Sequence, residues 1–431
     1  MLYLKSLELE NVRCFGKKQR IDFTGADGKI SQWTVILGDN GTGKTTILRS
    51  IVSLLPSPQS FLDRRNHLET EYNLSINNGW RNAWDLKHKN GEEDSILSLV
   101  VAECQKPFDS EYEASLYHTV NHKKDNSDNA YSGTTKFDTR VLSPVYCFAY
   151  GANRKVGTKS LSGEKLLQAN ETLFNEEALL QNSEEYFLQI DYETIKQKKG
   201  SQIRDKVKDL LLQILPTGVK DIRVSKAGRL QRTVQVETPF GWVSINELSL
   251  GYKTTIAWLI DFATKMMYYN EKSKTPFDEP AILILDEIDL HMHPAWQREI
   301  IQNLTELFPR TQFIVTAHSP LIAQAALDSN LALLKRTTDQ IKIINEPAII
   351  RSWRIDQVLT SDLFGLQESR SPKVEKILRQ RRNLLFKDDL NAADKKKLKQ
   401  LESKIDEIPI AETQEYIKAM EIVLKASKHS S

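Results

Sequence analysis

The chain has 431 residues, 40% of them hydrophobic and 27% charged, and its 59 Lys and Arg against 57 Asp and Glu leave a net charge of +2. That composition is ordinary for a globular protein, and the balance of charge excludes a chain-wide attraction to nucleic acid, so any DNA contact needs a local basic patch. The three cysteines form no C-x-x-C pair and indicate neither a zinc site nor a disulfide framework. No apolar run reaches the roughly 20 residues of a membrane helix, so we expect a cytoplasmic protein without membrane contact.

The N-terminal third is predicted to alternate strands with a helix. Residues 4–15 alternate apolar and polar side chains, which favours a half-buried strand antiparallel to 19–23. A short aliphatic strand, 33–37, runs into a glycine-rich turn and a helix over 44–55 that a proline ends. The polar stretch 121–138 is expected to be a mobile surface loop.

The middle of the chain is predicted to be helical from about 165 to 215, followed by a β-hairpin over 221–245 with Gly228 at its turn. The stretches "AILILDE" and "QFIVTAHSP" then indicate two buried strands of the parallel type, separated by a helix. The residues after Trp353 are predicted to form charged helices.

The phosphate-loop pattern G-x-x-x-x-G-K-[ST] is met by "GDNGTGKTT", Gly38 to Thr46, between a strand and a helix. Its glycines let backbone N–H groups face an anion, and the helix N-terminus adds partial positive charge. Lys44 is expected to reach the β- and γ-phosphates of ATP, and the Thr45 hydroxyl to bind Mg²⁺. The alternative, a glycine-rich turn with a chance lysine, is disfavoured by the flanking strand and helix. The expected nucleotide-binding residues here are Asn40, Gly41, Thr42, Gly43, Lys44, Thr45 and Thr46.

Two acids, Asp286 and Glu287, end a buried aliphatic strand, where parallel α/β sheets bind ligands. Asp286 is expected to hold Mg²⁺ through water and Glu287 to polarise the attacking water; alternatively, Asp286 only caps the next segment. His318 ends a further strand, 31 residues after Glu287, and is a candidate γ-phosphate sensor, although a lone histidine is more often a packed or surface residue.

A fourth motif, "LSLG" (Leu248 to Gly251), lies at the predicted start of a buried helix. These four motifs, in this order, resemble those of the ATP-binding-cassette (ABC) ATPases. The resemblance implies an α/β head with a mixed central sheet, an antiparallel β subdomain and a helical lobe. It also implies that Ser249 and Gly251 close on the ATP of another copy, in a homodimer or higher homo-oligomer that holds ATP and Mg²⁺ at its interface. In that assembly Lys44, Glu287 and His318 would be the catalytic residues.

The stretches "LELENVRCF", "FAYGANR", "LDEIDLHMHP" and "VTAHSP" resemble the RecF/SMC/OLD-like branch of these ATPases, which acts on nucleic acid. By this resemblance Arg13 contacts the nucleotide; the alternative is a solvated arginine. Arg154 is a candidate replacement for the lobe-linking glutamine of the family. His291 and His293 favour a turn that packs against the other subunit over a metal site, because no further ligand is evident.

Within the branch, the absence of heptads over the 205 residues from Lys44 to Ser249 sets aside the coiled-coil arms of SMC proteins, and the short C-terminal part leaves no room for a Toprim nuclease. The stretches "ETLFNEEALLQNSEEYFLQIDY" and "RIDQVLTSDLFGLQESRSPKVEKIL" resemble the ATPase subunits of Septu anti-phage systems (the PtuA family), also found beside retrons. This implies an ATP switch that regulates a separate HNH nuclease subunit (PtuB-like) and meets DNA directly or through that partner.

Two other functions remain as alternatives. One is a RecF/SMC-like recombination or repair clamp without a dedicated nuclease. The other, the ATPase of a membrane transporter, is disfavoured because Pro294 stands where the transporter pattern has an aspartate.

The C-terminal segment from Arg370 to Lys404 is basic, with 12 Lys and Arg against 5 Asp and Glu. It is expected to dock a partner or to contact DNA phosphates; alternatively, it is a solvated helical hairpin packed on the head. Its apolar residues could form one helical face: Val374, Ile377, Leu378, Leu384 and Leu385.

The expected organisation has four parts: an N-terminal part of the ATPase head with the phosphate loop and the β subdomain, a helical lobe with the hairpin, a C-terminal part of the head, and a helical extension. Their expected bounds are 1–164, 165–234, 235–350 and 351–431.

Overall fold

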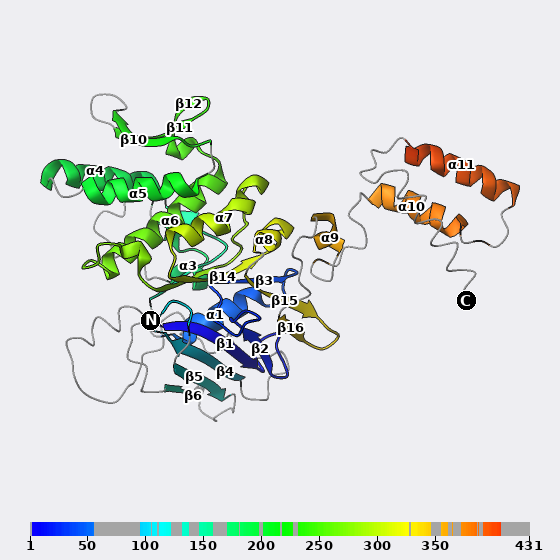
Figure 1. The fold of residues 1–431 in the computed structure, drawn as a ribbon, viewed down its shortest axis with the longest axis horizontal. Coiled ribbons are helices and arrows are strands. Elements are labelled where there is room, and N and C mark those ends of the chain that lie inside the picture. Colours follow the sequence, from blue (N-terminus) through cyan, green and yellow to red (C-terminus); the bar gives the residue numbers. More distant parts are fainter. Residues whose placement is uncertain are drawn as a thin grey trace. The chain divides into compact units, whose positions relative to one another are not determined.

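The computed structural model is a mixed α/β fold with a separate C-terminal helical unit (Figure 1). The first unit, Met1–Val358 with Asp362–Phe364, is called the head below; the second, Leu359–Ser361 with Gly365–Ser431, is called the C-terminal unit. The structure describes residues 2–55, 95–104, 106–109, 112–121, 132–137, 146–157, 170–180, 182–197, 201–215, 218–226, 232–326, 329–345, 355–360, 364, 372–385, 387 and 391–406.

A six-stranded sheet forms the centre of the head, in the order β16-β15-β3-β14-β13-β7. Its strands are β3 (Trp33–Gly38), β7 (Cys147–Tyr150), β13 (Ala281–Leu285), β14 (Thr311–Ala317), β15 (Asn330–Arg336) and β16 (Ile341–Asn345). Neighbouring strands are parallel except that β16 is antiparallel to β15, so the sheet is mixed as expected. Because β3, β13 and β14 are parallel neighbours, the loops that follow them meet at one edge of the sheet.

One face of the central sheet packs against α1 (Lys44–Leu54), which lies between it and a five-stranded antiparallel sheet (Figure 1). That second sheet has the order β2-β1-β4-β5-β6. The alternation of strand side chains explains the packing: Ile36, Ile284 and Ile314 join the α1 cluster, while their neighbours face the other way. The strands are β1 (Leu2–Glu10), β2 (Gln19–Asp22), β4 (Ser95–Glu103), β5 (Tyr112–Asn121) and β6 (Ser132–Phe137).

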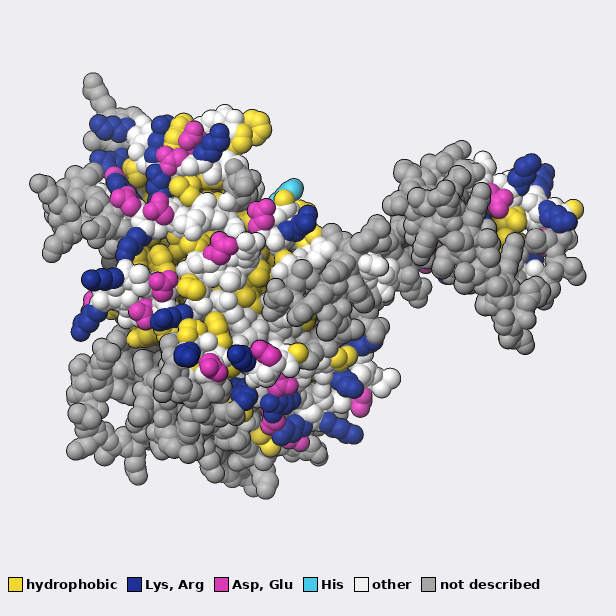
Figure 2. Space-filling model, in the orientation of Figure 1, with side chains coloured by type: hydrophobic (Ala, Val, Ile, Leu, Met, Phe, Trp, Pro, Cys, Tyr) yellow, Lys and Arg dark blue, Asp and Glu magenta, His cyan; other side chains and the backbone are white. Residues whose placement is uncertain are grey.

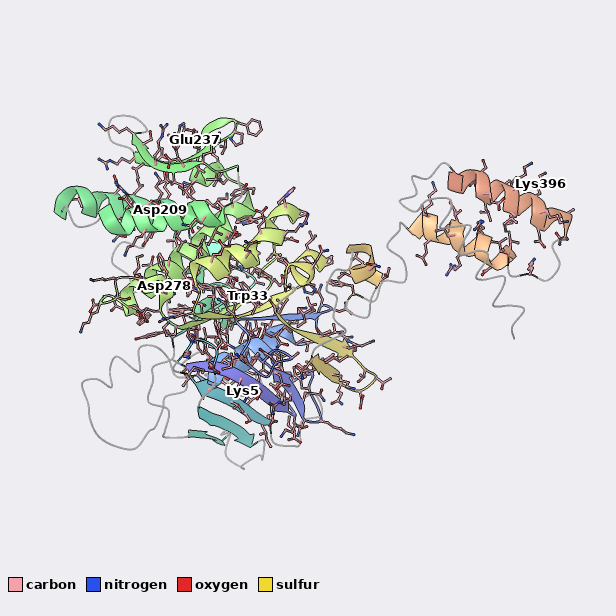
Figure 3. All side chains as sticks on the ribbon, viewed as in Figure 1. Lys5, Trp33, Asp209, Glu237, Asp278 and Lys396 are labelled. Carbon is pink, nitrogen blue, oxygen red and sulfur yellow. The ribbon has the colours of Figure 1, made fainter. Side chains whose placement is uncertain are left out.

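The opposite face of the central sheet packs against helices. Val35, Leu285 and Val315 share one apolar cluster with the buried side of α6. Trp33 stacks on Phe313 in that cluster, with ring centroids 4.1 Å apart, and lies inside the head (Figure 3). The helices are α4 (Ser183–Gln197), α5 (Ser201–Ile214), α6 (Leu250–Tyr269), α7 (Pro294–Leu307) and α8 (Pro320–Ala325).

A three-stranded antiparallel sheet in the order β10-β11-β12 packs on α4 and α5. Its strands are β10 (Asp221–Lys226), β11 (Arg232–Thr238) and β12 (Gly241–Ser244). The expected hairpin is thus part of a larger sheet, and β11 runs through the boundary expected at residue 234. The turn predicted at Gly228 lies outside the described residues. The remaining short elements of the head are α3 (Glu171–Phe174), β8 (Lys155–Val156), β9 (Leu179–Leu180) and two 3₁₀ turns, Ile245–Glu247 and Pro276–Asp278.

Two predictions about the N-terminal part were wrong in extent. The strand expected over 4–15 ends at Glu10, because Asn11 (φ 54°) and Arg13 (φ 50°) adopt left-handed backbone conformations and turn the chain. The stretch 121–138 was expected to be a loop, but Ser132–Phe137 forms β6 and pairs with β5, since backbone pairing in a ladder does not need apolar side chains.

The C-terminal unit contains α10 (Pro372–Leu385) and α11 (Ala392–Asp406), and α9 (Ile355–Thr360) straddles the division between the units. Leu384 and Leu401 are buried, whereas Leu385 is 37% exposed and does not share the apolar face predicted for it. Within the ranges given above, none of the helices combines the length and the apolar character needed to cross a membrane. On the face of the head seen in Figure 2, Lys and Arg side chains alternate with Asp and Glu.

Candidate functional site

The phosphate loop follows β3 and bends sharply before α1. Gly38 (φ 154°), Gly41 (φ 74°) and Gly43 (φ 90°) adopt positive φ values that side chains disfavour. At Gly43 space is also limiting, because a Cβ there would lie 2.5 Å from Cys14 Sγ and 3.0 Å from the Phe15 ring. Glycine at this position therefore permits both the backbone turn and the close approach of residues 14–15.

Lys44 is the first residue of α1 and is only 6% exposed. Its Nζ donates hydrogen bonds to the main-chain oxygens of Gly38 (2.8 Å) and Asp39 (3.0 Å), which hold the ammonium over the loop. Burial lowers the pKa of Lys44, while the carboxylates of Asp286 and Glu287 act in the opposite direction. A cation is therefore held inside the glycine-rich loop, where it could pair with a bound anion.

The other loop residues shape this turn. The Thr42 hydroxyl, buried, donates to the main-chain oxygen of Asp39 (2.8 Å) and closes the loop. Thr46 is buried in the first turn of α1, where its main-chain oxygen accepts a hydrogen bond from Ser50 (2.8 Å). Asn40 and Gly41 are exposed at the apex.

A hydrogen-bond network joins the phosphate loop to the strand that carries the acids. The Thr45 hydroxyl donates to Oδ2 of Asp286 (2.6 Å), although the two residues are 241 positions apart. The Thr316 hydroxyl, on β14, donates to Oδ1 of the same carboxylate (2.6 Å) and accepts a hydrogen bond from the Glu287 N–H (2.7 Å). Both oxygens of the buried Asp286 are thus fixed, and Thr316 aligns the two acids.

Glu287 lies in a left-handed backbone conformation (φ 50°), which is unusual for a residue with a side chain. Its main-chain oxygen accepts a hydrogen bond from Nη2 of Arg154 (2.7 Å). Arg154 is 5% exposed, and burial lowers its pKa to about 10 against the opposing effect of the neighbouring carboxylates, so it is charged at neutral pH. The Arg154 guanidinium therefore helps to hold the turn that presents Glu287.

His318 follows β14 at the same edge. Its main-chain N–H donates to both carboxylate oxygens of Asp289 (3.1 and 3.3 Å), whereas its buried Nε2 has no hydrogen-bond partner. A buried ring nitrogen without a partner is costly unless a ligand completes its hydrogen bonding. His318 is thus placed at the end of β14 beside the loop that follows the two acids, with one nitrogen available.

The signature residues occupy the start of α6. Ser249 is its exposed N-cap residue, and its hydroxyl makes no capping bond. Gly251 is buried against the loop that carries His291. A Cβ at this position would lie 2.1 Å from the main-chain oxygen of His291, so only glycine fits. The N-terminus of α6 is therefore packed directly on the loop that follows the Asp-Glu pair, with the Ser249 hydroxyl left free.

Arg13 lies in the tight turn between β1 and β2, where Val12 and Phe15 exchange main-chain hydrogen bonds of 2.8 Å. The next residue, Cys14, donates its thiol proton to the main-chain oxygen of Thr42 (3.7 Å) and so places this turn against the phosphate loop. The nucleotide contact expected for Arg13, the neighbour of Cys14 in this turn, stays a prediction.

Three residues of this region were missed in the sequence. Thr316 and Asp289 lie two residues before His318 and two after Glu287, so the alternation of side chains along and after the strands could have revealed them. Arg336, at the end of β15, has its Nη2 3.7 Å from the position of a Gly41 Cβ. No local sequence pattern marks Arg336, because only the pairing of β15 with β3 brings this residue to the phosphate loop.

The residues present fit ATP and Mg²⁺. The loop combines positive-φ glycines, a buried lysine and a helix N-terminus, which suits a polyphosphate. The Thr45 and Asp286 oxygens are of the hard type that Mg²⁺ prefers. Among the described residues no group of three or more His, Cys, Asp or Glu could hold a metal by itself, and the ring of His293 instead accepts a hydrogen bond from the Ala295 N–H (3.3 Å) as the N-cap of α7.

A family model described as "AAA ATPase domain" matches residues 2–323. The chain is 25% identical over 406 residues to the Septu protein PtuA of Bacillus mycoides (strain KBAB4), covering 94% of this chain and 50% of that protein, so it spans about half the length of this relative. It is also 25% identical to the Retron Vc95 probable ATPase of Vibrio cholerae serotype O1 biovar El Tor, covering 79% of this chain and 74% of that protein. Among solved structures, the SMC head domain from Thermotoga maritima matches with a TM-score of 0.41 and 17% identity, covering 79% of this chain and 98% of that one.

Proposed function

The chain belongs to the AAA ATPase domain family, and from that premise we propose that it is an ATP-operated switch, in which two copies close around Mg²⁺ and ATP to control a nuclease partner. Its ATPase domain is of the ABC type, because the phosphate loop, the Leu-Ser-x-Gly motif, the Asp-Glu strand and the strand-end histidine occur in that order. The likeness to Septu and retron ATPases supports the assignment to defence against phage.

The observation that carries the ATPase assignment is the network around Asp286. Thr45 from the phosphate loop and Thr316 from β14 donate to opposite oxygens of one carboxylate, at 2.6 Å each. This fixes two oxygen atoms, Thr45 Oγ1 and Asp286 Oδ2, where a divalent cation bound to a nucleotide needs ligands. Bound Mg²⁺ and ATP would supply the transferable phosphoryl group and the charge that polarises it.

The chain's own residues then divide the work. Lys44 neutralises negative charge on the phosphates, and the loop N–H groups hold them in place. The Glu287 carboxylate, presented by a turn that Thr316 and Arg154 both hold, orients the attacking water and accepts its proton. His318, whose Nε2 has no partner in the protein, donates from this nitrogen to an oxygen of the γ-phosphate.

A second copy enters the proposal because of the N-terminus of α6. There the exposed Ser249 hydroxyl makes no capping hydrogen bond and could bind a nucleotide held by another copy. The helix dipole adds partial positive charge at this end of α6. In the proposed head-to-tail dimer, Ser249 and the Gly251 N–H of one copy close on the nucleotide held by the other. Hydrolysis would release this contact and so reset the switch.

Nucleotide-dependent dimerisation tests this part of the proposal. Size-exclusion chromatography with light scattering should give a monomer without ATP and a dimer with ATP for the Glu287→Gln protein. Lys44→Ala should remove nucleotide binding, and Ser249→Arg should keep binding but prevent the dimer. If Ser249→Arg protein still dimerises with ATP as the parent does, the trans-acting role of α6 is wrong.

The nuclease partner is a separate step of the proposal. The chain is similar to Septu PtuA, and the family resemblance of its sequence implies an HNH nuclease subunit that cuts DNA while this chain senses and regulates. Affinity purification from the native locus, followed by mass spectrometry, should recover a small HNH protein in fixed proportion. If the chain elutes alone, dimerises with ATP and binds DNA, the nuclease partner is wrong and the chain is better described as a recombination or repair clamp.

A further inference from the structure

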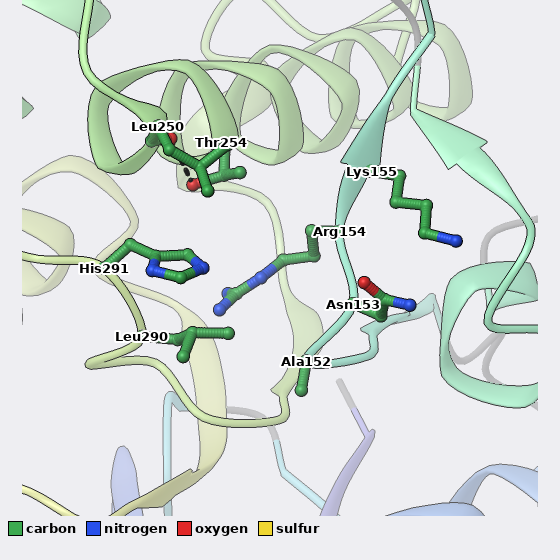
Figure 4. Close-up of a pocket in the computed structure, with 8 residues that line it drawn as sticks. All are labelled: Ala152, Asn153, Arg154, Lys155, Leu250, Thr254, Leu290 and His291. Carbon is green, nitrogen blue, oxygen red and sulfur yellow. Dashed lines mark hydrogen bonds between the residues drawn. The ribbon is translucent and has the colours of Figure 1, made fainter.

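A pocket of about 270 Å³ lies beside the candidate site, within the head (Figure 4). Three segments form its walls: the turn after β7, the first turn of α6 and the loop after β13. Arg154 and Lys155 line one wall, Leu250 and Thr254 of α6 another, and Leu290 and His291 the third. The volume is below the roughly 300–1,000 Å³ of most small-molecule sites, so the pocket suits one small group.

The ionisable side chains that line the pocket are all basic. The lining contains Arg154, Lys155 and His291 and no Asp or Glu. In Figure 4 the Arg154 guanidinium and the His291 ring point toward each other across the pocket, whereas Lys155 points away. Lys155 instead pairs with Glu177 at 3.0 Å. Two nitrogen-bearing groups therefore converge from opposite walls.

Of the two terminal nitrogens of the Arg154 side chain, one makes a hydrogen bond and the other does not. Nη2 donates to the Glu287 main-chain oxygen at 2.7 Å, whereas Nη1 is buried and has no hydrogen-bond partner. A buried donor on a charged group is costly when it is unsatisfied, and a charge-assisted bond to an anion would remove that cost. The carboxylates near Arg154, of Asp286, Glu287 and Asp289, are not part of the pocket lining.

We propose that this pocket binds inorganic phosphate, held between Nη1 of Arg154 and the ring of His291. The inference rests on the proposed function for its source, because phosphate is the product of ATP hydrolysis and Arg154 joins the pocket to the residue that activates the attacking water. The phosphate would bridge the turn before β8, through Arg154, and the loop after β13, through His291, whose main chain packs against Gly251 at the start of α6.

The test is a calorimetric titration of inorganic phosphate into the Lys44→Ala protein, in which the phosphate loop no longer competes. Saturable binding with a dissociation constant on the order of 1 mM is expected. On this background Arg154→Gln should weaken binding about 10- to 100-fold, because it removes a charge-assisted bond. His291→Ala should weaken it about 3- to 10-fold, and it leaves the bond between Arg154 and Glu287 in place.

Lys253→Ala is the matched control, since Lys253 lies on α6 next to Thr254 but does not line the pocket. Phosphate binding should be unchanged in this variant. The proposal is overturned if the Lys44→Ala protein binds no phosphate, if His291→Ala binds as well as its parent, or if the control loses as much affinity as the pocket variants. ATP binding by the wild-type chain is measured separately, so failure of the pocket is distinguishable from failure of the ATPase assignment.

Discussion

Thr316 is a single hydroxyl that organises both acids of the site. It donates to Asp286 and accepts from the Glu287 N–H, so it sets the carboxylate of one and the backbone of the other. Thr316→Val removes both bonds but keeps the shape of the side chain. We expect turnover of ATP to fall about 10- to 100-fold, the effect of losing one or two buried hydrogen bonds, while Thr316→Ser retains most of the activity. A phosphate-release assay that finds Thr316→Val as active as Thr316→Ser would contradict this role.

Thr316 and Arg154 hold the main chain of Glu287, whereas its side chain is the base of the proposed mechanism. Glu287→Gln keeps the size of the side chain and removes its capacity to accept a proton. We expect ATP binding to remain and hydrolysis to fall by at least about 100-fold, so that the dimer persists. Light scattering can measure how fast the ATP-bound dimer dissociates. If the dimers of Glu287→Gln and wild-type protein dissociate at the same rate, Glu287 is not the base.

Gly251 shows how closely the signature helix is packed. A Cβ at this position would lie 2.1 Å from the main-chain oxygen of His291, so Gly251→Ala must push α6 away from that loop. We expect a loss of about 1–3 kcal/mol in the free energy of unfolding, the usual cost of overpacking, together with weaker ATP-dependent dimerisation. The control is Gly218→Ala, where the nearest atom outside the immediate chain neighbours is 3.8 Å away. If denaturant titrations find the two variants equally stable, the packing argument fails.

At the scale of elements, a buried polar cluster connects the central sheet with α6. The Tyr150 hydroxyl and the Lys265 ammonium both donate to Oδ2 of Asp261, at 2.6 Å each. Burial and the Asp261 carboxylate raise the pKa of Tyr150, so its phenol keeps the proton that it donates. The strand that leads to Arg154 and the helix that begins with the signature are thus joined by one carboxylate.

Breaking this cluster should destabilise the head. Asp261→Asn leaves the Lys265 charge buried without its partner, and we expect a loss of about 3–5 kcal/mol in unfolding free energy. The double variant Asp261→Asn with Lys265→Met removes the charge as well and should recover part of that loss. Urea denaturation of the single and double variants measures both effects, and a double variant less stable than Asp261→Asn would show that the unpaired charge is not the cause.

The sequence predicted most elements that have a strong local signal. The aliphatic strands β3, β13 and β14 and the helix after the phosphate loop were recognisable from their apolar runs and glycines. The strand β6 was not, because "SGTTKF" carries little apolar signal and is a strand only by pairing with β5. The end of β1 at Glu10 was also missed, because Val12 and Cys14 continue the alternation of apolar and polar residues past it, although Asn11 is of a type enriched in left-handed conformations.

The residues of the candidate site were also predictable only where their signal is local in the sequence. Motif residues such as Lys44, Thr45 and Asp286 could be named because their spacing within a motif is local, and the structure brings them together. Arg154 was suggested only by resemblance, and its bond to the Glu287 backbone depends on the neighbouring positions of β7 and β13. Arg336 required the pairing of β15 with β3, which no local pattern predicts.

At the scale of the whole molecule, the head and the C-terminal unit are separate compact units with different chemistry. The C-terminal unit presents exposed lysines on α11, among them Lys395, Lys396 and Lys397 (Lys396 is labelled in Figure 3). The apolar side chains of Leu384 and Leu401 are buried within the described helices, which leaves charge as the main feature of this surface.

Deletion of residues 370–431 should therefore separate two functions. We expect ATP binding to survive, because none of the candidate nucleotide-binding residues lies in the deleted part, and binding of the partner or of DNA to be lost. Fluorescence titration with labelled ATP and co-purification with the partner measure the two results. A truncated protein that still forms the same complex would show that the C-terminal unit does not carry the contact.

The bond between Thr45 and Asp286 also bears on the synthesis of the protein. The strand β3 has β14 and β15 as its two neighbours, so the strand before the phosphate loop lacks both until residues 311–336 have left the ribosome. At about 5–20 residues per second, the 241 residues from Thr45 to Asp286 take roughly 12 to 50 s to translate. During that time a hydrophobic strand has unpaired edges, which makes the nascent chain a substrate for chaperones. A nucleotide can bind the completed site only after β14 and β15 have been synthesised, so the proposed switch cannot operate before that point.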